Sequence, residues 1–127
     1  MQQKPNVLVC NDDGIHAPGV RALIIALHSL DVCNVFVCCP ANEQSGKSQS
    51  ITLGGTIVTR HLHGVHAESL GCIEVHGTPA DAVMVGLASD TFSQQVNACS
   101  PSRQADGLVL KQTGITGLAC WYVCMCY

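Results

Sequence analysis

Two short apolar runs separated by an amphipathic segment dominate the first third of the chain. The runs 7–10 and 35–39 do not alternate between apolar and polar positions, which is typical of parallel strands buried on both faces. Between them, apolar residues recur at helical spacings of three and four after Pro18, a residue suited to the first turn of a helix. They are Val20, Leu23, Ile24, Leu27 and Leu30. The order strand, helix, strand predicts a right-handed βαβ unit in an α/β fold with a parallel sheet.

The pattern from Ile51 to His76 is different, because β-branched and polar residues are interrupted by glycines. It predicts two or three short strands with turns at Gly54-Gly55 and near Gly64. Three histidines in this stretch invite a metal interpretation: His61, His63 and His66. No third ligand stands at a fixed spacing from the first two, so an exposed polar strand edge explains them better. Glu74 and His76 are expected to form a cross-strand polar pair.

The residues after His76 are typical of a helix start. Thr78 is placed as the N-cap, Pro79 at the first helical position and Asp81 in the positively polarised first turn. Small apolar residues follow over 82–87. We therefore expect a second, well-capped helix in this region.

Composition favours one small globular domain. The chain has 127 residues, of which 47% are hydrophobic, and its formal charge is −3. It contains no run of Lys or Arg, which argues against a nucleic-acid partner and against a membrane-surface partner. Any recognition of phosphate must therefore be local.

Nine cysteines would suggest a disulfide framework in a secreted chain. However, residues 1–6 lack a signal-peptide pattern and run directly into the first apolar segment. We therefore expect reduced thiols and a cytoplasmic protein. Several cysteines lie in or beside apolar runs, where a free thiol behaves as a small hydrophobic group; they are Cys10, Cys33, Cys38 and Cys39.

Two adjacent carboxylates, Asp12 and Asp13, follow the first predicted strand, where open α/β sheets bind ligands. Gly14 allows a sharp turn there. Two such charges repel by roughly 4 kcal/mol at contact distance and an effective dielectric near 20, unless a cation or proton lies between them. Oxygen ligands suit Mg²⁺, Mn²⁺ or Ca²⁺. The alternative is a solvated turn with an aspartate N-cap, since Asn-Asp-Asp-Gly is also good turn composition.

His16 lies about one turn from the two acids. It could act as a general acid or contact a phosphate. It could equally be a residue at the entry to the first helix. The residues leave both alternatives open.

The polar loop 41–50 should leave the same sheet edge as the two acids, because neighbouring parallel strands end on one side. Its residues 41–48 fit a relaxed phosphate-loop pattern. A true phosphate loop feeds a helix that holds the anion, whereas residues 51–58 have strand-and-turn composition. This argues against a nucleoside triphosphatase. Lys47 can still attract a substrate phosphate as a point charge.

The string Asn11–Gly19 after a strand resembles the opening signature of the SurE-type nucleotidase (survival protein) family. The resemblance continues through 40–50 and Gly77–Val83 and fades near Ser93. It covers about three quarters of this chain but only the N-terminal part of the family's domain. It implies a Rossmann-like parallel sheet with βαβ units.

The resemblance also implies a function: a metal-dependent phosphomonoesterase that hydrolyses nucleoside 5′- or 3′-monophosphates with Mg²⁺ or Mn²⁺. By this resemblance Asp12 and Asp13 are catalytic metal ligands, and the hydroxyl of Ser45 is a further hard oxygen ligand. A serine that caps its own loop is the alternative for Ser45. Asn11, Lys47 and His16 are the expected substrate-binding residues, and Asn11 also shapes the turn.

Beyond Ser93 the family pattern is absent, so we divide the chain into a partial nucleotidase domain, 1–93, and a divergent, poorly ordered tail, 94–127. The tail lacks the family's Ser-Gly-Ile-Asn loop with its asparagine ligand, and 113–117 echoes it only faintly, with Thr116 in the asparagine's place. The apolar run 118–127 is too short for a membrane span and is an aggregation hazard.

These departures predict a truncated or alternatively spliced product with impaired activity. The alternative is a catalytically inactive isoform or a binding fragment. A family-type oligomer is not expected, because the tail lacks the family's C-terminal assembly arms.

Overall fold

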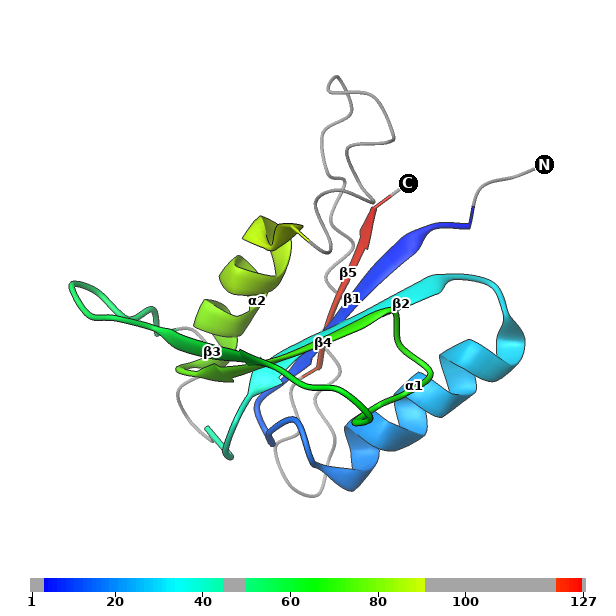
Figure 1. The fold of residues 1–127 in the computed structure, drawn as a ribbon, viewed down its shortest axis with the longest axis horizontal. Coiled ribbons are helices and arrows are strands. Elements are labelled where there is room, and N and C mark those ends of the chain that lie inside the picture. Colours follow the sequence, from blue (N-terminus) through cyan, green and yellow to red (C-terminus); the bar gives the residue numbers. More distant parts are fainter. Residues whose placement is uncertain (1–3, 45–49, 91–120, 127) are drawn as a thin grey trace.

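The computed structural model describes residues 4–44, 50–90 and the backbone of 121–126. The described residues form a five-stranded β-sheet flanked by two helices (Figure 1). The elements in chain order are β1 (Asn6–Asn11), α1 (Pro18–Leu30), β2 (Asn34–Pro40), β3 (Val58–His61), β4 (Gly71–His76), α2 (Pro79–Ala88) and β5 (Trp121–Cys126). No helix in these ranges is long and apolar enough to cross a membrane.

The sheet has the strand order β3-β4-β2-β1-β5. The three central strands are parallel, since β2 pairs with both β1 and β4 in that sense. The two edge strands, β3 and β5, are antiparallel to their neighbours. The α/β class and the βαβ unit β1-α1-β2 predicted from the sequence are therefore confirmed, with a parallel centre and antiparallel edges.

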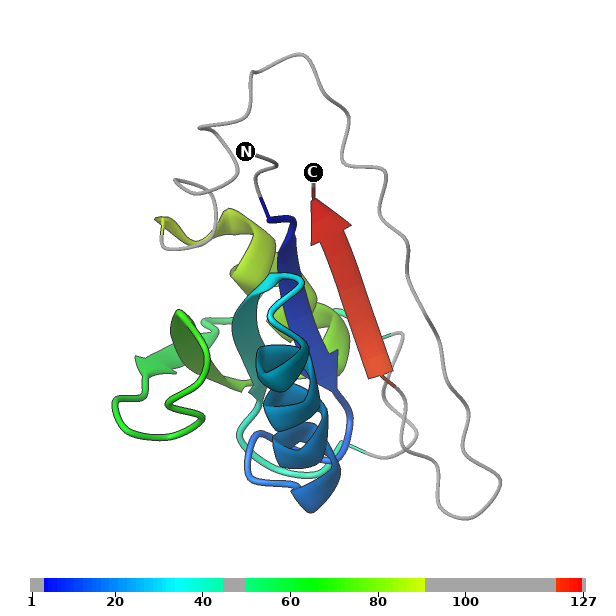
Figure 2. The same cartoon turned by 90° about the vertical axis from the view of Figure 1, so that its right-hand side faces the viewer.

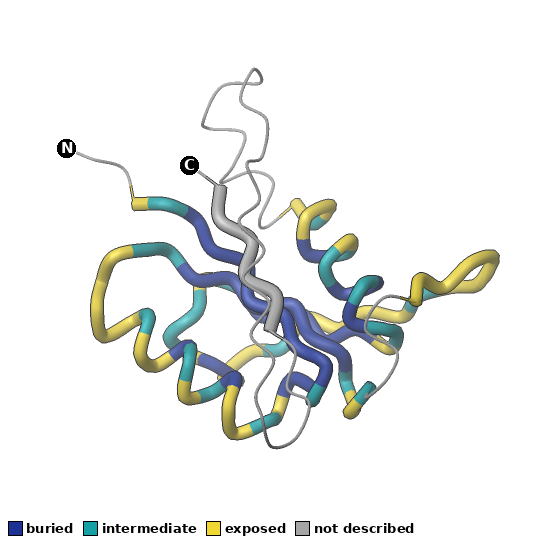
Figure 3. The backbone as a smooth tube through the Cα atoms, turned by 180° about the vertical axis from the view of Figure 1, so that it is seen from behind, coloured by how far each residue is buried: buried dark blue, intermediate teal, exposed yellow. Residues whose placement is uncertain are grey.

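The helices cover opposite faces of the sheet (Figure 2). Alternate residues of β1 point to different faces, so Val9 packs with Val20 and Ile24 of α1 while Leu8 packs with Ala82 of α2. The central strands are buried almost throughout, as Figure 3 shows. This explains why their sequences do not alternate between apolar and polar residues.

The close fit of α2 to the sheet depends on a small residue. A Cβ atom on Gly86 would lie 2.8 Å from Leu8 Cδ2 and 3.0 Å from Cys38 Cβ. The helix can therefore approach β1 and β2 only because this position has no side chain.

Residues 51–76 contain two strands, β3 and β4, which agrees with the predicted two or three. Residues 50–57 form no helix, which agrees with the argument against a phosphate loop. The expected turns are present, with Gly54 at φ +73° and Gly64 at φ +79°. The expectation that Glu74 and His76 pair across strands is wrong, because both lie on β4. The five cysteines whose side chains are described are free.

The segment Trp121–Cys126 pairs antiparallel with β1 from Asn6 to Asn11 (Figure 2). This segment lies in the apolar run 118–127, for which the sequence predicted an aggregation hazard and no place in the sheet. In the structure its partner is the edge of β1. Residues 91–120, with the faint echo at 113–117, lie outside the described ranges, and the division of the chain at residue 93 stays a prediction.

Candidate functional site

The candidate site lies where the parallel strands end. The acidic turn follows β1, and the loop that begins at Ala41 follows β2 at the same edge, as parallel strands require. Two backbone hydrogen bonds join turn and loop: Ile15 N donates to Pro40 O (2.8 Å) and Gln44 N donates to Asp12 O (2.7 Å). The predicted site residues Ser45 and Lys47 lie outside the described residues.

Asn11 shapes the turn from inside. It is fully buried, and its Nδ2 donates to Gly14 O at 2.9 Å. Gly14 has φ +102°, and a Cβ atom there would lie 3.3 Å from the Asn42 carbonyl carbon. Glycine is thus needed for both the conformation and the close approach of the loop. The Oδ1 atom of Asn11 is buried without a hydrogen-bond partner.

The turn concentrates negative charge. Asp12 is buried, and Asp13 is half-buried beside it. Burial raises the pKa of Asp13, and the charges of Asp12 and Glu43 raise it further. Glu43 was not among the predicted site residues. Its place in the loop after β2 was the available signal, because that loop was expected to face the acids.

The donor set fits a hard divalent cation. The carboxylates of Asp12 and Asp13 repel one another, and the unpartnered Asn11 Oδ1 adds a buried oxygen near the same turn. Within the described ranges, no three His, Cys, Asp or Glu side chains are grouped so that they could hold a metal ion. A cation at this turn would therefore need further oxygen ligands besides the two aspartates.

The aspartate N-cap proposed as an alternative for the acidic turn is wrong. The N-cap of α1 is Ala17, which makes no side-chain capping hydrogen bond, and no acidic residue lies in the first turn of that helix. Asp12 and Asp13 therefore do not cap α1.

His16 is exposed, and its Nε2 lies 3.8 Å from Glu74 Oε2. Glu74 is a nearly buried carboxylate on β4 that also faces His76 Nε2 at 3.2 Å and Arg60 Nη1 at 3.8 Å. The structure thus brings three basic side chains around one acid near the site edge. The role of His16 as a general acid, phosphate contact or helix-entry residue stays open.

The three histidines of the β3–β4 region have different environments. His61 and His63 are exposed, as expected for a polar strand edge. His66 is 5% exposed, and its Nε2 lies 2.6 Å from Ile15 O in the turn after the acids. Sequence reasoning missed this contact, because His66 lies on an irregular loop where no periodicity reports burial.

The start of α2 is hydrogen-bonded to Ser50 and Thr52. Thr78 is the N-cap and Asp81 lies in the first turn, as predicted, and the two residues also form a capping box. Asp81 also accepts hydrogen bonds from Thr52 N (2.9 Å) and Thr52 Oγ1 (2.6 Å), and Thr78 Oγ1 donates to Ser50 O. Burial raises the pKa of Asp81, but these hydrogen bonds outweigh it and hold the pKa below its ordinary value.

The sheet has a parallel centre, and a turn with two aspartates follows the C-terminal end of β1. This arrangement is typical of open α/β proteins, in which ligands bind outside the C-terminal ends of the parallel strands. The family model described as Survival protein SurE matches residues 7–100. The chain therefore belongs to the SurE family.

Individual relatives agree with this assignment. The chain is 40% identical over 83 residues to the 5'-nucleotidase SurE of Methanopyrus kandleri, which covers 65% of this chain and 30% of that protein. It is 42% identical over 86 residues to the 5'-nucleotidase SurE of Chlorobaculum tepidum, covering 68% and 31%. For the protein of Flavobacterium psychrophilum with that name, identity is 36% over 98 residues, covering 76% and 36%. The chain matches about a third of the length of these relatives.

Proposed function

We propose that this chain carries the metal-binding part of a phosphomonoesterase that acts on nucleoside monophosphates. The observation that carries the proposal is the pair Asp12 and Asp13 at the carboxyl end of β1, in a turn with excess negative charge and a buried unpartnered oxygen. The substrate class is supported by the relatives, which are named 5'-nucleotidases. A cytoplasmic location belongs to the same proposal.

In this proposal Asp12 and Asp13 hold Mg²⁺ or Mn²⁺, and Ser45 supplies a hydroxyl ligand from the loop after β2. When bound, such a cation stabilises negative charge on the phosphoryl oxygens and makes water more acidic. Asn11 holds the shape of the turn that carries both carboxylates by donating to Gly14 O. Lys47 and loop amides bind the remaining phosphate charge. His16 contacts the phosphate or transfers a proton.

The second candidate is a binding fragment without catalytic activity. The observation that favours it is the lack of a Ser-Gly-Ile-Asn segment in residues 94–127. With one ligand fewer, water can complete the shell of the cation, so affinity survives while the geometry of the reacting groups is lost. A displacement of about 1 Å can reduce a rate on the order of a hundredfold.

The test begins with metal binding. Isothermal titration of the metal-free chain with Mn²⁺ is compared with the variants Asp12→Asn and Asp90→Asn. Asp12→Asn removes a charge and a strong ligand and should abolish binding. Asp90→Asn removes the same charge from an exposed site far along the chain and should leave the affinity unchanged. Equal affinity in the Asp12 variant and the parent would remove the metal site.

The second step separates enzyme from binding fragment. Hydrolysis of a nucleoside monophosphate is measured with Mn²⁺ and with a chelator, for this chain and for a version in which a Ser-Gly-Ile-Asn segment and its following strands replace residues 94–127. We expect much slower turnover by the parent. Comparable specific activities would show that residues 94–127 replace the function of the family's Ser-Gly-Ile-Asn loop. The prediction of impaired activity would then be wrong.

A further inference from the structure

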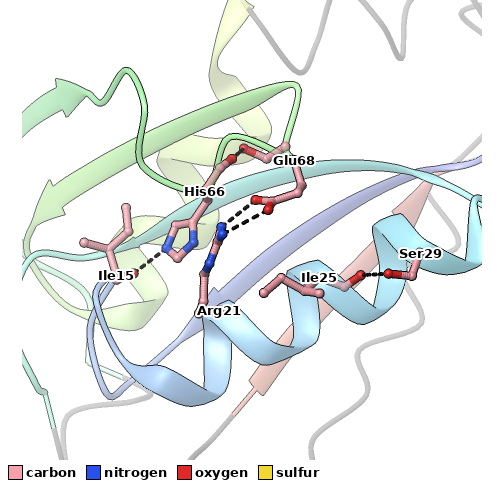
Figure 4. A network of polar contacts seen from close by, with 7 residues as sticks. Ile15, Arg21, Ile25, Ser29, His66 and Glu68 are labelled. Atoms are coloured by element: carbon pink, nitrogen blue, oxygen red, sulfur yellow. Dashed lines mark hydrogen bonds and ion pairs between the residues drawn. The ribbon is translucent and has the colours of Figure 1, made fainter.

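His66 reaches the acidic turn from a separate part of the chain. It lies on the loop 62–70 between β3 and β4, and its ring points to the carbonyl of Ile15, two residues after Asp13 (Figure 4). A carbonyl oxygen only accepts hydrogen bonds, so Nε2 carries the proton in this 2.6 Å contact. The other ring nitrogen, Nδ1, is buried without a hydrogen-bond partner.

Ile15 is consequently held from two sides. Its N–H donates to Pro40 O at the end of β2, and its carbonyl accepts from His66. Its side chain is fully buried and packs in the cluster with Val20 and Ile24. These contacts fix the backbone where it leaves the acidic turn.

The contact is made under unfavourable local conditions. His66 has φ +49°, a conformation in which Asn or Gly would be less strained, and it leaves Nδ1 unpaired in the interior. Neither the positive φ nor the unpaired Nδ1 stabilises the loop, so filling the loop position does not explain a histidine here. The hydrogen bond to Ile15 is the interaction that a shorter side chain at the same position would lose.

The loop has a second, independent attachment. Glu68 Oε1 accepts from Arg21 Nη2 at 2.9 Å, in a two-pronged pair with the first helix (Figure 4). This pair ties the loop to α1, and neither of its residues belongs to the acidic turn. It therefore allows the general attachment of the loop to be tested apart from the hydrogen bond of His66.

We infer that His66 is a positioning residue for the cation site: by holding the Ile15 carbonyl it fixes the direction of the Asp12 and Asp13 carboxylates. The inference rests on the proposed function, since it assumes that these carboxylates bind a divalent cation. His66 itself does not contact the cation. It acts through the backbone between Asp13 and Ile15.

Two substitutions of His66 separate this role from loop packing. His66→Gln places an amide N–H at the same bond distance from Cβ as Nε2, so it can still donate to Ile15 O. His66→Asn is too short for that contact but accepts a positive φ more readily. Mn²⁺ titration should show affinity near the parent's for His66→Gln and a loss of roughly three- to tenfold for His66→Asn, the range expected for one hydrogen bond.

The control is Glu68→Gln, which weakens the other attachment of the same loop and should leave the affinity for Mn²⁺ unchanged. Amide hydrogen exchange of residues 12–17 without metal is the second readout and should quicken only in His66→Asn. A loop-packing role predicts the reverse order of the two His66 variants, with Gln worse than Asn, and that order would overturn the inference. If the parent binds Mn²⁺ and His66→Asn binds it equally well, the positioning role of His66 is overturned and the metal site stands. If the parent does not bind Mn²⁺, the proposed function is overturned as well.

Discussion

The carboxylate of Asp81 accepts two hydrogen bonds from Thr52, one from the backbone N–H and one from the hydroxyl, across 29 residues of sequence. The same carboxylate accepts from Thr78 N in the capping box of α2. Asp81 therefore joins the helix start to the segment that follows the loop containing Ser45. Gly77 makes room for this arrangement, since a Cβ atom there would lie 2.7 Å from Asp81 Oδ2.

Thr52→Val tests this link, because it removes the hydroxyl donor and leaves the backbone donor and the shape in place. A hydrogen bond to a buried charged group contributes roughly 1.5–3 kcal/mol, so we expect a loss of about that size or somewhat less in the free energy of unfolding. Thr59→Val, at an exposed position of β3, is the matched control and should change stability by less than about 0.5 kcal/mol. Chemical denaturation measures both.

The difference between parent and Thr52→Val should depend on pH. The folded pKa of Asp81 lies below its unfolded value, so its contribution is complete above the ordinary aspartate pKa and is lost as pH falls through the folded pKa. The two proteins should therefore differ most at neutral pH and converge in acid. A constant difference between pH 7 and pH 2.5 would show that the hydroxyl of Thr52 does not act through the Asp81 carboxylate.

Gly86→Ala tests the packing of α2 on the sheet. Alanine is the better helix former by about 1 kcal/mol, but its Cβ would meet Leu8 and Cys38 at 3.0 Å or less. Overpacking of a filled core usually costs about 1–3 kcal/mol. We therefore expect a net loss of stability in thermal unfolding. Met84→Ala on the exposed side of the same helix is the control, with little change expected. A stabilised Gly86→Ala protein would contradict the close approach.

The buried thiols should resist alkylation in the folded protein. Burial raises the pKa of Cys72 to about 12 and raises the pKa of Cys10 and Cys38 as well, so the reactive thiolate is scarce. Iodoacetamide labelling at pH 8, read by mass spectrometry, should leave these three thiols unmodified until denaturant is added. Rapid labelling of Cys72 in the native protein would show that β4 opens locally.

The sequence predicted those parts of the fold that depend on local periodicity. The strands around α1 and the N-cap at Thr78 follow from spacings within one element. It did not predict that the segment Trp121–Cys126 would pair with β1, because such pairing depends on which sheet edge is free. The register of β3 against β4 was equally inaccessible, so the sequence did not show that Arg60 and Val58 lie opposite Glu74 and His76.

The same distinction holds at the site. The acids and the loop after β2 were expected to converge because parallel strands end on one side, and their described residues do so. Glu43 and His66 reach the turn through irregular backbone. No spacing rule describes such loops, and the positive φ of His66 is visible only in the folded chain.

Asp13→Asn tests the electrostatics of the acidic turn without metal. Burial and the charges of Asp12 and Glu43 raise the pKa of Asp13, so the ionised form is less favourable in the folded than in the unfolded chain. Removing the charge should therefore raise the free energy of unfolding at neutral pH, by about 0.5 kcal/mol for a partly exposed group. Urea denaturation in the presence of a chelator is the measurement.

The pH dependence of this effect has a definite sign. Because the folded pKa is the higher one, the folded chain binds more protons in the window between the two values, and stability falls as pH rises through that window. The parent should lose stability from about pH 4 upward relative to Asp13→Asn, and the two should agree at lower pH. Mn²⁺ should reverse the order at neutral pH, because the cation stabilises only the protein that retains both carboxylates. Asp90→Asn should show neither effect. If Asp13→Asn were less stable than the parent without metal, the two aspartates would not repel one another, and the charge argument for a cation at this turn would fail.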